Sequence, residues 1–137
     1  MKTSPLIAAS AAIVLLLGVL HLVYTFRGEK LHPRDADLIT NMDRVSQVIS
    51  RETSMWRVWM GLNATHSFGL MLFGLVYGYL AIFESAFLFR SWFLLGLGVT
   101  LLLGYSIVAR LYFFSAPLRG VALAMFLYVV GIIVHRG

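Results

Sequence analysis

The sequence contains no cysteine and carries little charge. Without cysteine, the chain cannot form disulfides, thiolate metal sites, iron–sulfur clusters or a cysteine nucleophile. Only 12% of the 137 residues are charged and 60% are hydrophobic, whereas soluble domains average about 25% charged residues. This imbalance is typical of a membrane protein, and the length suits a single membrane domain over residues 1–137.

Acidic residues are absent from every long apolar run of the sequence. Their absence excludes a carboxylate-bridged metal centre within the membrane, and the chain has no nucleotide-binding, zinc-protease or serine-hydrolase motif. We therefore expect no catalytic residue and no metal site. The net charge of +5 comes from basic residues at the ends of the apolar runs. Such residues are typical of anchors at anionic lipid headgroups and do not form a face that binds nucleic acid.

Four apolar runs predict an all-α protein, a bundle of four transmembrane helices. Runs 5–26 and 58–83 have no charged residue, and each exceeds the roughly 20 residues that a helix needs to cross the hydrocarbon. Run 92–114 is apolar until Arg110. Run 116–134 has Arg119 in its first turn, where the side chain can reach the headgroups. The first run ends in VYTFRG without a small-residue cleavage site, so we expect a membrane helix and not a cleaved signal peptide.

The segment 27–57 between the first two runs is the only long polar part of the chain. Pro33 can begin a helix, and acidic residues that follow it are favourable in a first helical turn. Apolar residues then recur at helical spacing, at Leu38, Met42, Val45 and Ile49. The pattern predicts an amphipathic helix on the membrane surface or over the mouth of the bundle. A solvated linker is the alternative interpretation.

Basic residues are distributed unequally between the two sides of the predicted bundle. The loop 27–57 and the turn 115–120 together hold seven of them, whereas the opposite side holds Lys2, Arg90 and Arg136. The positive-inside rule counts Lys and Arg in this way. It predicts a cytoplasmic loop and outward-facing termini, in what we expect to be a bacterial cytoplasmic (inner) membrane.

The stretch GLNATHSFG, residues 61–69, puts several polar residues into an otherwise apolar run. At about 100° per residue, Asn63, Ser67, Gly74 and Gly78 fall on one stripe of the helix, with His66 at its edge. The two glycines form a GxxxG motif, which lets another helix approach closely. We therefore expect this stripe to face another helix.

The other spans carry similar faces, and their polar residues lie in the half of the bilayer next to the long loop. His21 shares a face of the first span with Val14, Leu17 and Gly18. On the third span one face holds Gly96, Thr100, Leu103, Ser106 and Arg110. Small and polar residues together are typical of helix-contact faces.

These faces predict a polar pocket on the loop side of the bundle. Its candidate lining residues are Trp59, Asn63, His66, Ser67, Ser106 and Arg110. Two simpler interpretations stay open: Arg110 can extend to the nearby surface, and the Asn63, Thr65 and Ser67 side chains can bond neighbouring helices.

His21 and His66 form the most specific pair of candidate cofactor ligands. Two histidines on adjacent spans at comparable depth could ligate a b-type haem iron axially, since neutral imidazole is a common metal ligand. No second histidine pair lies within the predicted spans. The alternative is that each histidine only bridges helices, so the cofactor is left unknown.

Two segments carry a resemblance to known proteins. HLVYTF closes the first span, and MWRVWMGLNATHSFGLMLFGLVYGYLA opens and forms the second. Over residues 18–82 the chain resembles a group of small four-span bacterial integral membrane proteins without an assigned function, and more loosely the DoxX-like proteins. The resemblance implies a fold and a membrane location, and it marks His21, Trp59, Asn63 and His66 as positions to test.

These patterns predict a non-catalytic integral membrane protein whose loop-side polar pocket binds a lipid-like ligand or seats a partner subunit. Besides the lipid bilayer, the expected partners are further copies in a homo-oligomer or the other subunits of a membrane complex. The second hypothesis is a haem-binding electron-transfer protein that uses His21 and His66. The third is a small oligomeric transporter.

Overall fold

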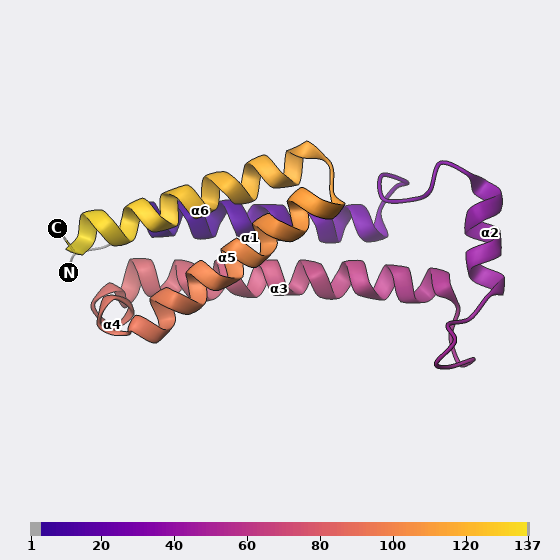
Figure 1. The fold of residues 1–137 in the computed structure, drawn as a ribbon, viewed down its shortest axis with the longest axis horizontal. Coiled ribbons are helices and arrows are strands. Elements are labelled where there is room, and N and C mark those ends of the chain that lie inside the picture. The colour runs from indigo at the N-terminus through magenta and orange to yellow at the C-terminus, as the bar shows by residue number, and fades with distance from the viewer. Residues whose placement is uncertain (1–3, 137) are drawn as a thin grey trace. The chain divides into compact units, whose positions relative to one another are not determined.

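The protein is helical throughout the part that the computed structural model describes, residues 4–136. No β-strand occurs among these residues, which contain a single isolated β-bridge. Figure 1 shows the helices, which are in chain order α1 (Pro5–Phe26), α2 (Ala36–Arg44), α3 (Met55–Phe83), α4 (Ser85–Arg90), α5 (Trp92–Tyr112) and α6 (Ser115–Arg136).

Four of these helices, α1, α3, α5 and α6, are long and apolar enough to cross a membrane, as the sequence predicts. α1 has the predicted bounds, and α3 begins at Met55 instead of residue 58. α5 ends at Tyr112 instead of residue 114, and α6 spans Ser115–Arg136 instead of 116–134. The Ser91 hydroxyl oxygen caps α5 by accepting a hydrogen bond from the Leu94 amide at 3.2 Å.

The predicted amphipathic helix is present as α2, but its predicted extent is wrong. It begins after Asp35, whose carboxylate accepts a hydrogen bond from the Asp37 amide at 2.9 Å. It ends at Arg44, and Val45 is already extended. The Val45 carbonyl accepts a hydrogen bond from the Met55 amide at 2.9 Å, which turns the chain back towards α3. Val45 and Ile49 therefore lie outside the helix.

The described chain divides into two compact units, and α1 and α3 each contribute to both. One unit comprises Met1–Leu17 with Leu70–Gly137, of which residues 4–17 and 70–136 are described, and the other is Gly18–Gly69. The first unit holds a core to which α1, α3, α4, α5 and α6 all contribute, for example through Val14, Phe73, Leu88, Leu102 and Tyr128.

Direct contacts hold α1 against α3 and α6 within the first unit. The Ser10 hydroxyl donates to the Ala124 carbonyl at 2.7 Å, and both residues are fully buried. Gly74 of α3 lies so close to α1 that an added Cβ would be 2.6 Å from the Leu15 Cβ. At Gly78 an added Cβ would be 3.7 Å from the Ala11 Cβ, an ordinary contact. The prediction that the Gly74 and Gly78 face meets another helix is confirmed.

An aromatic cluster lies where α3, α5 and α6 meet. The rings of Phe73 and Tyr77 are stacked with centroids 4.5 Å apart, and Tyr128 meets Tyr77 edge to face at 5.6 Å. The Tyr77 hydroxyl donates to the Leu94 carbonyl of α5 at 2.7 Å. Gly98 of α5 leaves the space that the Tyr128 ring and hydroxyl occupy. The cluster therefore depends on a glycine at this point of α5.

The predicted contact face of the third span is wrong in most of its residues. α5 buries Leu95, Gly98, Leu102 and Ala109. Gly96, Thr100, Leu103 and Arg110 are exposed, and Ser106 is half-buried. α5 is apolar on all sides, and in such a helix hydropathy does not reveal which face packs against protein.

Candidate polar site between α1 and α3

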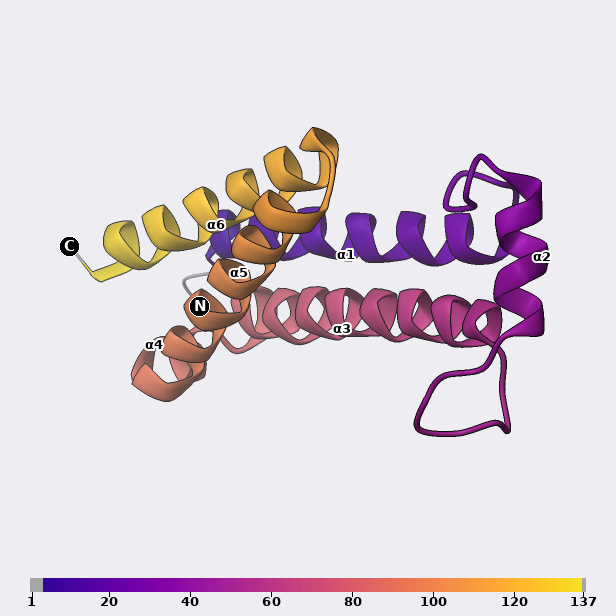
Figure 2. The same ribbon diagram turned by 45° about the vertical axis from the view of Figure 1, so that its right-hand side comes forward.

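The polar residues of the first two spans meet in the second unit. There the last part of α1, residues 18–26, runs beside the first part of α3, residues 55–69, as Figures 1 and 2 show. His21 points to α3, and its Nε2 atom lies 3.0 Å from the Oδ1 atom of Asn63. His21 and Asn63 are both half-buried. This hydrogen bond joins α1 to α3 through two residues that are 42 positions apart in the sequence.

The hydrogen bonds of Asn63 indicate which ring nitrogen of His21 is the donor. The Nδ2 atom of Asn63 donates to the Trp59 carbonyl one turn earlier at 2.8 Å. A carbonyl oxygen can only accept, so the oxygen of this amide is the atom that faces His21. The Nε2 atom of His21 must then carry a proton and donate it. In the neutral ring, Nδ1 is left as the hydrogen-bond acceptor.

His66 completes the site from the next turn of α3. Its ring meets the His21 ring edge to face, with centroids 5.1 Å apart and planes at 77°. His66 is half-buried, as His21 is. His21, Asn63 and His66 thus form one contiguous cluster, which we call the histidine layer. The sequence prediction placed both histidines at similar depth, and the structure brings them into contact.

The hydroxyl groups around the histidine layer are bonded within their own helices. The fully buried Ser67 donates to the Asn63 carbonyl at 2.9 Å. The buried Thr25 donates to the His21 carbonyl at 2.8 Å, and the exposed Thr65 donates to the Leu62 carbonyl at 3.0 Å. Of Asn63, Thr65 and Ser67, whose side chains could bond neighbouring helices, only Asn63 does so. Sequence reasoning did not single out Thr25, although it lies one helical turn after His21.

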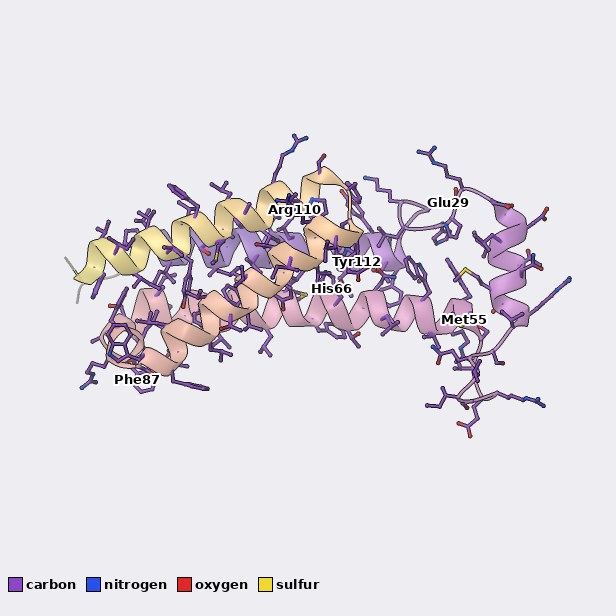
Figure 3. The ribbon with its side chains drawn as sticks, in the orientation of Figure 1. Glu29, Met55, His66, Phe87, Arg110 and Tyr112 are labelled. Carbon is purple, nitrogen blue, oxygen red and sulfur yellow. The ribbon has the colours of Figure 1, made fainter. Side chains whose placement is uncertain are left out.

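The remaining candidates divide between the two units. Trp59 belongs to the second unit, is 41% exposed and takes part through its backbone carbonyl. Ser106 and Arg110 belong to the first unit. The Ser106 hydroxyl donates to the Leu102 carbonyl at 2.8 Å, and Arg110 is exposed in the last turn of α5, near Tyr112 (Figure 3). Of the predicted lining residues, Asn63 and His66 contact His21, whereas Trp59 and Ser67 are bonded to Asn63 within α3.

The geometry of the histidine layer does not suit an axially ligated haem. A haem lies between its two axial imidazoles, each of which points a nitrogen lone pair at the iron. Here the two rings are in edge-to-face contact, and the Nε2 atom of His21 donates a hydrogen bond to the Oδ1 atom of Asn63. Among the described residues, no three His, Asp or Glu side chains lie together in a way that could hold a metal ion. The layer is therefore better suited to hydrogen bonding than to ligation.

A shallow open depression of about 320 Å³ lies elsewhere in the second unit. It is lined by Ile39, Thr40, Asp43, Arg44 and Trp56. The sequence pattern did not predict it, because its walls come from α2 and α3 and no local motif joins them.

The comparisons with known proteins give no assignment. No family model, curated protein or solved structure matches this chain.

Proposed function

We propose that this chain is a non-catalytic membrane protein, a bundle of four transmembrane helices, whose histidine layer binds the polar group of a lipid-like ligand. The observation that carries the proposal is the hydrogen bond between His21 and Asn63. An ionisable residue within a membrane span is costly, and where one is kept it commonly serves a function. Here two histidines and an amide lie together within helices that are mostly apolar.

The surroundings of the histidine layer favour an amphipathic ligand. The imidazole rings of His21 and His66 carry nitrogens that can donate or accept hydrogen bonds, which suits a ligand with a hydroxyl or another polar group. Apolar side chains on the same segments are open to the outside: Leu20 is 39% exposed, Val23 is 44% exposed and Leu62 is 62% exposed. A ligand with an apolar body and one polar group would match both features.

The membrane setting of the proposal follows from the helices and the charges. Four helices long and apolar enough to cross a membrane support an integral membrane protein. We place the loop 27–57 on the cytoplasmic side of a bacterial inner membrane, because it carries most of the basic residues.

Native mass spectrometry of the full chain, released from a mild detergent, tests the proposal. We expect the wild-type protein to retain an adduct of lipid mass. His66→Phe keeps an aromatic ring but removes both nitrogens, so it should lose this adduct. Thr65→Val is the matched control, because Thr65 is adjacent, exposed and bonded to its own helix.

A second measurement links the adduct to stability. Adding the extracted lipid at about 100 times its Kd should raise the unfolding free energy of the wild type by about 2.7 kcal/mol. His66→Phe should show no such increase. A wild-type protein without an adduct, or an adduct that survives in His66→Phe, would contradict the proposal.

The same preparations discriminate the other hypotheses. An adduct of protein mass that His66→Phe abolishes would identify a partner subunit or a second copy as the occupant of the layer. A haem would give a visible absorption band, and a transporter would move a solute across vesicles that contain the purified chain. Any of these results would contradict the proposal that the ligand is lipid-like.

A further inference from the structure

The loop between α2 and α3 makes a tight turn in its middle, and Val48 and Ile49 form the tip of this turn. Gln47 and Ser50 on either side of the tip form an isolated antiparallel bridge. The base of the loop is closed by the hydrogen bond from the Met55 amide to the Val45 carbonyl, 2.9 Å long. It is therefore a defined projection of the second unit.

The tip exposes the two most accessible large apolar side chains of the described chain. Val48 has a relative exposure of 109% and Ile49 of 89%. Tight turns favour Gly, Pro, Asn and Asp, which suit the backbone and the solvent. Val48 and Ile49 are not among the residue types that favour a turn, and their side chains are exposed instead of packed against the rest of the chain. Their exposure is unfavourable in water and favourable in an apolar environment.

The loop projects beside the start of α3. Figures 1 and 2 show it level with the first turns of α3, on the side away from α1, and Figure 3 labels Met55, where α3 begins. Trp56 and Trp59 lie in these first turns. Tryptophan is typical of the boundary between lipid headgroups and hydrocarbon. The tip therefore lies next to the membrane boundary of a helix that is long and apolar enough to span the bilayer.

The charges around the tip favour a lipid surface. Residues 44–57 carry Arg44, Arg51 and Arg57 against one acidic residue, Glu52. All four side chains are exposed. The acidic Asp43 just before this segment accepts a hydrogen bond from the Ser54 hydroxyl at 3.1 Å. A net positive segment with an aliphatic tip matches anionic headgroups above hydrocarbon.

We propose that the Val48–Ile49 tip inserts into the bilayer beside α3 and fixes the loop to a membrane surface that contains anionic lipid. The contact is distinct from the histidine layer and does not depend on a ligand there. It differs from the amphipathic helix expected from the sequence, because the inserting residues lie on a turn after α2 has ended.

Depth-dependent fluorescence quenching in vesicles tests the proposal on the full chain. Because the chain has no cysteine, Ser46→Cys gives a single labelling site in the loop and leaves both tip residues intact. Asn41→Cys on α2 gives a matched exposed control site. Vesicles contain phosphatidylcholine with or without phosphatidylglycerol, and either brominated lipid or aqueous iodide serves as the quencher.

We expect the label at residue 46 to be quenched several-fold more by brominated lipid than the label at residue 41, and less by iodide. Adding Val48→Ser and Ile49→Ser to Ser46→Cys should remove this difference, and leaving out phosphatidylglycerol should reduce it. Because Val48 and Ile49 are exposed, these changes leave the buried core intact. Iodide quenching at residue 46 equal to that at residue 41 would overturn the proposal. Protection from both quenchers would also overturn it, since protein and not lipid would then cover the tip.

Discussion

Replacing Gly74 by Ala should push α1 and α3 apart. The added Cβ would lie 2.8 Å from the Ala11 carbonyl oxygen and 2.9 Å from the Leu15 Cα, in addition to the Leu15 Cβ at 2.6 Å. Two of these three atoms belong to the α1 backbone, which cannot move aside by a change of rotamer. The clash can therefore be relieved only by displacing one helix from the other.

Gly78→Ala provides the matched control for this change. Gly78 lies one turn later on the same face of α3, where an added Cβ would have only the Ala11 Cβ within 4 Å, at 3.7 Å. Both substitutions gain the same helix propensity, at most about 1 kcal/mol. This gain cancels when the two variants are compared, so their difference measures the clash alone.

The size of the difference follows from overpacking, which typically costs about 1–3 kcal/mol in a well-packed core. We expect Gly74→Ala to be less stable than Gly78→Ala by this amount, and Gly78→Ala to be at least as stable as the wild type. Unfolding in mixed detergent micelles, followed by far-ultraviolet circular dichroism, measures both free energies. Equal stability of the two variants would refute the close approach of α1 and α3 at Gly74.

Two further predictions concern the polar site and the orientation of the chain. In a double-mutant cycle of detergent stability, His21→Ala and Asn63→Ala should couple by about 0.6 kcal/mol and by no more than about 1.7 kcal/mol, the range measured for hydrogen bonds between membrane helices. The cycle of Thr65→Ala with Asn63→Ala is the control and should be additive within about 0.5 kcal/mol; additivity in both cycles would mean that the two spans do not share this bond. A reporter fused after residue 137 should give a periplasmic signal in bacteria, because the basic loop is expected in the cytoplasm, and a cytoplasmic signal would reverse the assignment.

The sequence alone was enough to determine the long helices. α1 could be placed from Pro5 to Phe26 because its uncharged run ends at Arg27 and its length matches a membrane span. α3 and α6 are a few residues longer than predicted, since turns next to a span can continue its helix. α5 ends earlier than predicted, at Tyr112, because Phe113 is already extended. The short α4, Ser85–Arg90, was missed because six residues are too few for a helical period to stand out.

The loop was predicted only in part, for a different reason. The spacing of Leu38 and Met42 does belong to α2, but the same period continues by coincidence to Val45 and Ile49. The helix ends where Val45 becomes extended, and the Val45 carbonyl there accepts a hydrogen bond from the Met55 amide. Because that bond joins residues that are far apart along the segment, a local pattern cannot reveal it.

For the polar site, the sequence by itself determined which residues are exceptional, and the tertiary structure decided how they pair. A histidine in an apolar run stands out in any sequence, so His21 and His66 could be named at once. That His21 bonds Asn63, and that α5 buries Gly98 and leaves Gly96 exposed, depends on how the helices are rotated about their axes. In a membrane the lipid-facing and protein-facing sides of a helix are both apolar, so hydropathy cannot set that rotation. Close packing and hydrogen bonds between distant residues set it instead.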